Sequence, residues 1–346
     1  MAGWRPLTGA LAPAVAVFAI ALLGQPEAAL ADRSFDVAMA GPAIDPYGMV
    51  VVDRARTPQR FEFGVQAAFG WAHQPFRVTL ADPQMALSDQ QFSLIQNQLT
   101  VDLGFYFGLW DWLSIAAVMP MGVNFYDDSA IGEPIVPQTP GPKNPTGFPG
   151  TSGLYNNQPR QTIGISTAGV RDPRFAVKAR FYGGRYFEIG TILEMTAPLG
   201  DKNSFFGEKS VTFRPRLVTG LLLGRVNVAL SFGAIVRESS ELFDPYLPMN
   251  LRYQLAHELT WGAGIGLFAH RVLSLGIESF GTIPIAGDAT SATVTMLGSL
   301  SLRPVEKWRV ILAGGGGLLA DNPRNADGRI LLSLAYSLWP REGGLR

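Results

Sequence analysis

The chain has 346 residues, of which 47% are hydrophobic, only 16% are charged and 39 are glycine. Its 28 basic and 28 acidic residues cancel, so no net positive field would attract nucleic acid. The apolar fraction is too high for a disordered chain. Because the chain has no cysteine, disulfide scaffolds and thiolate metal sites are excluded, although this does not point to the cytosol.

The first 31 residues have the pattern of a secretory signal peptide. Arg5 supplies a positive charge, an apolar stretch covers residues 7–24, and Ala29 and Ala31 form a small-x-small cleavage site. The alternative is an uncleaved anchor, because the stretch is nearly long enough to span a bilayer. The cleavage site favours an exported chain.

Beyond residue 31, apolar residues alternate with polar or small ones, which is typical of strands with two unlike faces. In residues 226–235, for example, Val226, Val228 and Leu230 alternate with Asn227 and Ala229. In chain order, such segments fall near residues 60–71, 93–108, 112–123, 169–182, 186–199, 210–223, 226–238, 250–263, 271–283, 292–303, 307–319 and 328–339. The sequence therefore predicts an all-β fold of about twelve strands.

The connections between these segments alternate in length. Short ones are expected at residues 109–111, 183–185, 224–225, 269–270 and 304–306. Longer polar ones are expected at residues 72–92, 124–168, 200–209, 239–249, 284–291 and 320–327. An even number of amphipathic strands with this alternation predicts a transmembrane antiparallel up-and-down β-barrel, with short periplasmic turns and long extracellular loops. A soluble exported sandwich is the alternative, but it leaves the alternation of loop lengths unexplained.

The predicted domains follow from this barrel. Residues 1–31 are the signal peptide, 60–339 the outer-membrane barrel and 340–346 a periplasmic tail. Residues 32–59 either remain in the periplasm or enter the lumen as a small plug. The loop 124–168, rich in proline and glycine, is expected to be an external loop, with an inward constriction as the alternative.

Aromatic residues near the predicted strand ends fit the two boundaries of a bilayer, where the ring meets lipid and its polar tip meets water. The predicted interface aromatics are Trp71, Trp110, Trp112, Trp261, Trp308, Tyr336 and Trp339. In hydrocarbon every backbone polar group needs a partner within the protein, so these strands must close into a barrel.

The charged residues of the strands fall on the opposite face. Assigning the apolar face to lipid gives the candidate lumen residues Glu62, Asp102, Arg174, Lys178, Arg180, Glu188, Glu194, Arg214, Arg216, Arg252, Glu258 and Glu278. In a porin, such charges line a water-filled passage and set which solutes cross it. In a plugged barrel, the same charges neutralise one another and close the interior. A count of twelve strands does not decide between these alternatives.

One hairpin allows a prediction of register. If Phe181 stays on the outer face, a three-residue turn sets Arg180 opposite Glu188 and Arg174 opposite Glu194. Both pairs are of opposite charge, and the first is a candidate lumen gate. We expect that Glu188→Gln changes conductance or anion preference without preventing assembly.

Enzymatic patterns are weak. His257 falls on the outer face of its strand, where a barrel lipase would need a serine and a polar orienting group beside it. Its neighbours Leu255 and Leu259 supply neither, so a headgroup contact is the better interpretation. The run Gly314–Gly317 lacks the spacing of a phosphate loop and leaves room for barrel curvature or for opposing lumen groups. The sequence therefore predicts no enzyme, cofactor or metal.

Several runs resemble the barrel portion of OmpA-like outer-membrane proteins of myxobacteria and their relatives. They are GVRDPRFAVKARF at 169–181, the stretch from Glu188 to Val218, the segment from Asp45 to Phe76, and HELTWGAGIGLF at 257–268. The resemblance implies an outer-membrane barrel that is a transporter or an envelope component. Only residues 340–346 follow the last strand, so the peptidoglycan-binding domain usual in that family is not carried over.

The sequence as a whole predicts a barrel of the bacterial outer membrane that allows passive or gated passage of small solutes. The alternative is a non-conducting structural barrel with a salt-bridged lumen, and a barrel lipase or acyltransferase is a remote third. The expected partners are outer-membrane lipids, the barrel assembly machinery, through the aromatic-ended last strand, and small solutes, with no nucleic acid. The oligomeric state is left open.

Overall fold

A computed structural model describes residues 41–80, 90–125, 168–201, 205–242, 253–285, 292–319 and 324–338, all within the compact unit Asp32–Arg346. The predicted signal peptide and tail, Arg252, Trp339 and most of the loop 124–168 lie outside these residues. In the part of the chain that is described, no helix is long and apolar enough to cross a membrane.

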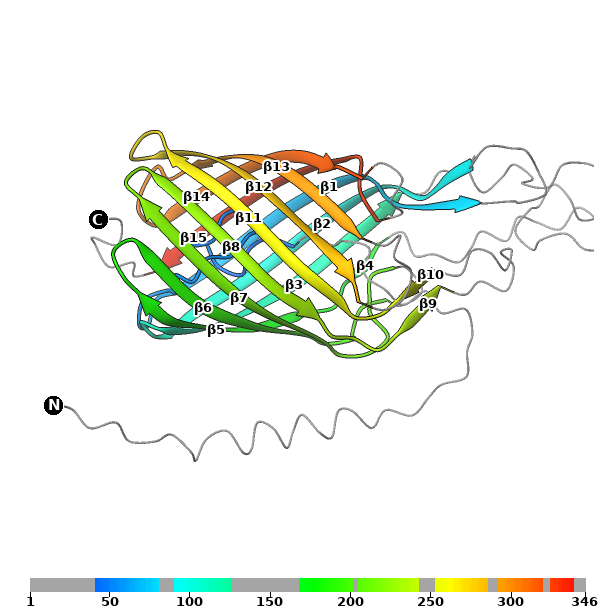
Figure 1. The fold of residues 1–346 in the computed structure, drawn as a ribbon, viewed down its shortest axis with the longest axis horizontal. Coiled ribbons are helices and arrows are strands. Elements are labelled where there is room, and N and C mark those ends of the chain that lie inside the picture. The colour runs from blue at the N-terminus through cyan, green and yellow to red at the C-terminus, as the bar shows by residue number, and fades with distance from the viewer. Residues whose placement is uncertain are drawn as a thin grey trace, which may run out of the picture. The chain divides into compact units, whose positions relative to one another are not determined.

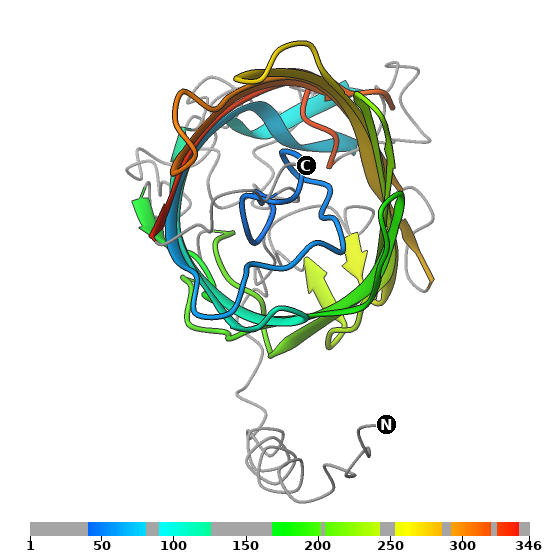
Figure 2. The same cartoon turned by 90° about the vertical axis from the view of Figure 1, so that its left-hand side faces the viewer.

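Twelve long antiparallel strands form a closed barrel, as predicted (Figures 1 and 2). They are β1 (Phe63–Leu80), β2 (Gln90–Trp110), β3 (Leu113–Phe125), β5 (Arg174–Gly183), β6 (Phe187–Thr196), β7 (Thr212–Leu223), β8 (Val226–Ile235), β11 (Glu258–Phe268), β12 (Leu273–Pro284), β13 (Thr293–Leu302), β14 (Trp308–Gly317) and β15 (Gly328–Leu338). Each strand pairs with its neighbours in this order, and pairing of β15 with β1 closes the ring, so the barrel has no open edge.

The period-two alternation separates the two faces of the wall. On β12, the side chains of Leu275 and Ile277 are 47% and 56% exposed, whereas Glu278 of the same strand is fully buried. Large apolar side chains cover the outside in this way on every side of the barrel, as with Phe69 on β1 and Leu312 on β14. An apolar exterior around a charged interior is the arrangement that a bilayer stabilises.

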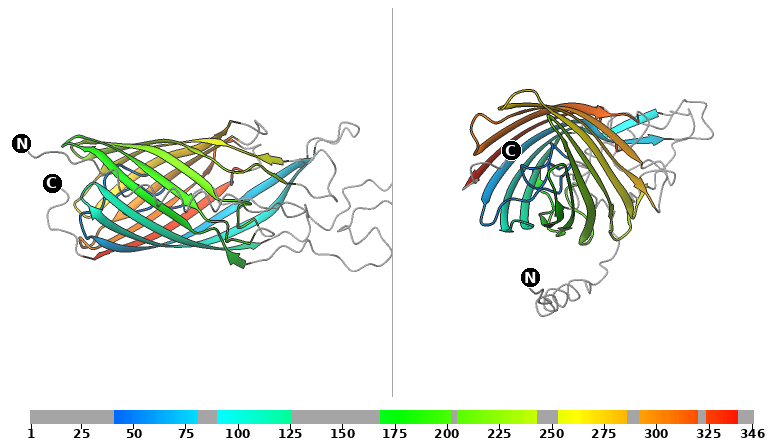
Figure 3. Two further views of the ribbon diagram at one scale, coloured as in Figure 1. Left: turned by 90° about the horizontal axis from the view of Figure 1, so that it is seen from below. Right: turned by 60° about the vertical axis from the view of Figure 1, so that its left-hand side comes forward.

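The first and the last barrel strand, β1 and β15, meet at the end of the barrel that has the short turns. Phe63 at the start of β1 pairs with Leu338 at the end of β15, and the strands tilt away from this end together (Figure 3). The turn between β7 and β8 is only Gly224 and Arg225, with Gly224 at φ 63°, a left-handed conformation that glycine adopts without strain. The short-turn end is periplasmic and the long-loop end extracellular, in the geometry of outer-membrane barrels.

The predicted boundaries of the first hairpin are wrong. The β1–β2 hairpin reaches residue 80 and resumes at residue 90, so the predicted loop 72–92 is mostly strand. Register shifts at His73, Phe76 and Arg77, with Gln74 at φ 47°, break the alternation and conceal the extension from the sequence.

Two other segments are divided. The predicted strand 169–182 splits into β4 (Ala168–Val170) and β5 around Pro173, whose missing N–H cannot join a ladder. The predicted strand 250–263 contains β10 (Tyr253–Leu255), which pairs with β9 (Ser240–Leu242) in a separate small sheet, and only the beginning of barrel strand β11.

The predicted register of the β5–β6 hairpin is also wrong. Arg180 pairs with Gly190 instead of Glu188, and Arg174 pairs with Thr196 instead of Glu194. The shift is two residues, followed by an irregularity between Arg180 and Tyr182. An even shift leaves each side chain on its predicted face, so alternation alone cannot detect it.

Candidate functional site: a lumen filled from the periplasmic end

The chain segment that precedes β1 lies inside the barrel. Residues 41–62, called the plug below, run as an irregular loop within the ring of strands, drawn in blue in Figure 2. Three backbone hydrogen bonds fold the plug on itself, from Ala43 N–H to Val50 O and from Met49 N–H to Val52 O, each at 2.9 Å, and from Glu62 N–H to Gln59 O at 3.0 Å. Most of its backbone polar groups therefore need partners from the wall.

A single carboxylate holds the turn of the plug. Glu278 of β12 accepts hydrogen bonds from the backbone N–H groups of Val50, Val51 and Val52, at 2.7, 2.9 and 2.9 Å. Hydrogen bonds to a charged acceptor are the stronger kind, and three on one buried carboxylate fix both position and orientation. Residues of the plug need not be charged for this contact, because only their backbone takes part.

Ion pairs fasten the plug to the opposite side of the barrel. Lys178 of β5 contacts Asp45 at 2.7 Å, and both side chains are fully buried. Arg216 of β7 contacts Asp53 at 2.8 Å. In the third pair, the charges are reversed, since Arg54 of the plug contacts Glu188 of β6 at 2.7 Å.

Arg309 of β14 binds the plug backbone from a third side. Its guanidinium donates to the carbonyl oxygen of Gly48 at 2.8 Å and also to that of Pro46. Beside it, the Met49 side chain lies against Gly264 and Gly276, where a Cβ atom would collide with or touch the Met49 side chain. The small residues of β11 and β12 thus provide the space that the plug occupies.

The plug leaves the lumen at the periplasmic rim. Tyr47 donates a hydrogen bond to Glu62 at 2.5 Å, and burial raises the pKa of the Tyr47 phenol, so its hydroxyl keeps the proton. Thr57 donates to the carbonyl oxygen of Asp111 in the β2–β3 turn at 2.6 Å. The first contact closes the plug on itself, and the second joins its end to the first turn of the barrel.

A charge cluster on the wall lies beside the plug. Glu194 of β6 is shared by Arg216 at 3.0 Å, Arg214 at 3.7 Å and Arg174 at 3.9 Å. The pair of Arg174 and Glu194 therefore forms across a diagonal, although the two residues are not directly opposed. Arg174 also contacts Asp102 at 3.6 Å, which extends the cluster across β3 to β2.

A second network bridges the extracellular end. Buried Glu258, at the start of β11, binds Arg324 of the β14–β15 loop at 2.5 Å and also binds Arg237 after β8. Arg237 continues to Glu208 of the β6–β7 loop at 2.7 Å. Here wall strands and their own loops are joined to one another through side chains.

The predicted lumen residues are mostly found inside. Buried are Glu62, Asp102, Lys178, Glu188, Glu194, Glu258 and Glu278, and half-buried are Arg174, Arg180, Arg214 and Arg216. The proposed Arg180–Glu188 gate is wrong, because Arg180 donates to the carbonyl oxygen of Asp111 and Glu188 binds Arg54.

Sequence reasoning missed charged residues of the plug, of the wall and of its loops. Among them are Asp45, Asp53, Arg54, Arg77, Arg171, Arg309 and Arg329, together with Glu208, Arg237 and Arg324 of the second network. The alternation carried a signal for Arg329, since it directly precedes outward-facing Ile330 on β15. No alternation marks the plug residues, because they lie outside any strand.

The predicted interface aromatics fall at two levels. Near the periplasmic turns, Trp110 stacks on Trp112 with ring centroids 5.9 Å apart, and Trp308 contacts Tyr336 at 4.8 Å. Trp71 and Trp261 lie toward the other end, since Trp71 pairs with Ile330 near the start of β15 and Trp261 with Gly281 near the end of β12. His257, which directly precedes β11, is exposed at this same end.

Closed antiparallel pairing, an apolar exterior and aromatic residues at two levels define a transmembrane β-barrel of the bacterial outer-membrane type. Solved structures agree with this class. The COG4313 outer membrane channel from Pseudomonas putida F1 is 14% identical, with a TM-score of 0.57 over 82% of this chain and 98% of that chain.

Two porins are similar at lower scores. The NanC porin is 5% identical, with a TM-score of 0.47 over 79% of this chain and 100% of that one. The KdgM porin in complex with oligogalacturonate is 9% identical, with a TM-score of 0.42 over 80% and 99%. No family model and no curated protein matches the sequence, so the resemblance to OmpA-like barrels stays a prediction.

Proposed function

We propose that the chain is a gated outer-membrane channel for small solutes, closed in this structure by the plug. The supporting observation is that a segment that belongs to no barrel strand lies within the ring of strands (Figure 2). Glu278, Lys178 and Arg216 bind it through polar contacts that water can replace. Withdrawal of the plug would leave a wall lined by charged and small residues, which is the lining of an aqueous passage.

A structural barrel is the second candidate, and the Glu194 and Glu258 networks favour it. These networks neutralise charges across neighbouring strands and would stiffen the wall whether or not solutes pass. The two functions differ in what removal of the plug does. In a channel it opens a path, and in a structural barrel it leaves the interior closed.

The test compares the mature chain with a variant that lacks residues 41–59, both refolded and inserted into planar bilayers. We expect rare or small conductance steps from the full chain and persistent steps severalfold larger from the deletion variant. A heat-modifiability gel checks that strands β1 to β15 still form a barrel. If the deletion variant is folded and inserted but silent, the channel proposal is wrong and the structural barrel is favoured.

The matched control replaces Glu258, which lies away from the plug, by glutamine. This variant disturbs a buried lumen charge but leaves the plug contacts in place. Under the proposal it does not reproduce the persistent large steps. Equal opening in the control would show that any disturbance of the lumen opens the barrel, and that the plug is not the gate.

A further inference from the structure

The arginines of the barrel strands divide into six with partners and one without. In the described strands, Arg77, Arg174, Arg214 and Arg216 contact carboxylates, and Arg180 and Arg309 donate to backbone carbonyl oxygens. Arg329 of β15 contacts no carboxylate or carbonyl oxygen among the residues that the structure describes, and its buried Nε lacks a hydrogen-bond partner. The guanidinium of this half-buried side chain has no oppositely charged group beside it in the described residues, so it is available to bind an anionic ligand.

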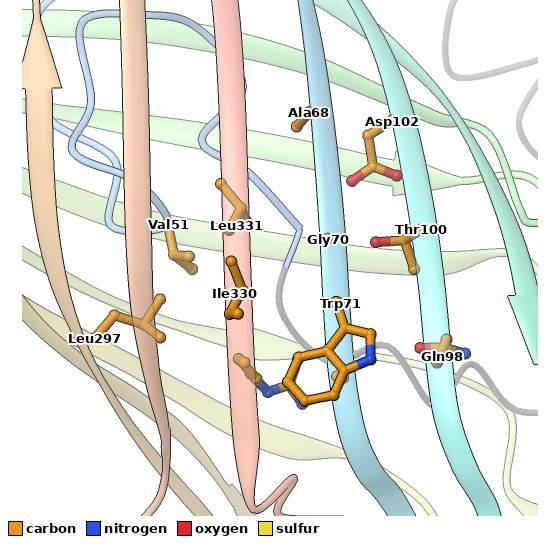
Figure 4. A pocket seen from close by; sticks show the side chains of 12 residues that line it. Val51, Ala68, Gly70, Trp71, Gln98, Thr100, Asp102, Leu297, Ile330 and Leu331 are labelled. Atoms are coloured by element: carbon orange, nitrogen blue, oxygen red, sulfur yellow. The ribbon is translucent and has the colours of Figure 1, made fainter.

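The space around Arg329 is left open by small residues. Its cross-strand neighbours are Ala72 on β1 and Gly315 on β14. A cavity of about 30 Å³ lies here, and Val51 of the plug is one of its lining residues. Figure 4 shows Val51 beside Leu331 in this lining. That volume admits a water molecule or the oxygen end of a larger solute.

The lining of this cavity has an apolar and a polar side. Leu297, Leu331 and Val51 form the apolar side, whereas Thr100, Gln98 and Asp102 of β2 are polar (Figure 4). Arg329 also lines the cavity and contributes a charged hydrogen-bond donor. Thr100 leans over Gly70, where a Cβ atom would meet its hydroxyl oxygen at 2.4 Å, so the hydroxyl borders the open space. A charged donor and a hydroxyl beside apolar surface are suited to the charged end of a small organic anion.

The surrounding charges favour an anion as well. Asp102, the carboxylate of the cavity lining, is already contacted by Arg171 and Arg174, each at 3.6 Å. Asp102 therefore has two guanidinium groups beside it, one of which, that of Arg174, also contacts Glu194 at 3.9 Å. Because other arginines already neutralise the Asp102 carboxylate, the positive charge of Arg329 is left to attract an oxyanion and resist a cation.

We propose that Arg329, with the Thr100 hydroxyl beside it, is a binding site for the oxyanion group of a small solute, a carboxylate or a phosphate, above the plug. The role of this site in solute passage rests on the proposed channel function. Binding of an anion to the site does not itself require conductance. The inferred solute class is anionic, and the binding site lies in the lumen between the plug and the extracellular Glu258 network.

The test uses the mature chain, its Arg329→Gln variant and a control, Arg180→Gln, which removes an arginine at the periplasmic turn. Calorimetry with sodium acetate and with sodium phosphate at millimolar concentration measures binding to folded protein in detergent. We expect Arg329→Gln to weaken binding at least tenfold and Arg180→Gln to leave it unchanged. Stronger binding of acetate or of phosphate identifies which oxyanion fits.

A second readout is the reversal potential in a salt gradient, for proteins that conduct. Arg329→Gln should shift it toward cation preference, and Arg180→Gln should shift it less. Binding that is equal in all three folded proteins, or absent from the mature chain for both anions, would overturn the site. Arg329-dependent binding in a protein that never conducts, even without residues 41–59, would retain the site and reject the channel.

Discussion

The charged contacts at the two ends of the lumen differ in what they join. In the periplasmic half, wall side chains such as Glu278 and Arg309 bind the backbone of the plug, which is not part of the wall. In the extracellular half, Glu258 joins Arg237 and Arg324, so the contact links the wall to its own loops. Under the proposed function, the first set of contacts can be lost while the barrel persists, whereas loss of the second set leaves buried charges within the barrel itself.

This difference separates gating from stability. A contact between wall and plug contributes to the equilibrium between closed and open lumen. A contact between wall and loop contributes to the free energy of unfolding of the barrel. Variants at the two ends should therefore change different measurements, and they would fail to do so if the plug were an integral part of the fold.

The largest expected effect is at the extracellular network. Glu258→Gln removes the shared partner of Arg237 and Arg324, both buried. Breaking a buried ion pair from one side costs about 3–5 kcal/mol. Urea unfolding in lipid vesicles should show this loss. The exposed turn residue Glu306 serves as control, since Glu306→Gln should change little, and an unchanged midpoint for Glu258→Gln would show that the network does not stabilise the barrel.

The next effect is on closure. Glu278→Gln removes the charge that binds three backbone N–H groups of the plug but keeps the side-chain shape. The lost charge-assisted hydrogen bonding amounts to about 2 kcal/mol. The ratio of open to closed lumen should then rise about thirtyfold, measured as open probability in single-channel records. A fall in barrel stability without any change in open probability would contradict the separation of the two regions.

The smallest effect lies at the membrane boundary, outside both regions. Trp308→Leu removes the ring contact with Tyr336. An aromatic pair contributes about 1 kcal/mol beyond its buried area, so unfolding in vesicles should shift by that amount. Adding Tyr336→Leu should then cost less than it does alone. Additive losses would mean that the two rings contribute independently, and neither variant should alter gating.

How far the sequence predicted the fold can be seen on β12. Leu275, Ile277 and Glu278 follow the alternation, and the structure confirms which faces lipid and which faces the lumen. The strand count and the alternating loop lengths are confirmed for the same reason, because each amphipathic strand carries its own signal. The β5–β6 register was wrong, since a shift of two residues leaves that signal unchanged.

The candidate site was only partly predictable. Glu188 and Glu278 were expected in the lumen, but their partners Arg54 and Val50–Val52 were not, because those residues lie in an irregular segment without periodicity. The two alternatives for residues 32–59 could not be separated from the sequence. In the structure, the described residues of that segment contact the wall from three sides.

By itself the sequence determined that the chain forms about twelve strands, each with a charged and an apolar face, because a bilayer stabilises that local alternation in each strand separately. Only the tertiary structure decided what fills the lumen. Which carboxylate meets the plug backbone, and that Arg329 meets none in the described residues, depend on ring closure and register. Those contacts join residues more than 200 positions apart, as between Val51 and Glu278, and no local pattern encodes them.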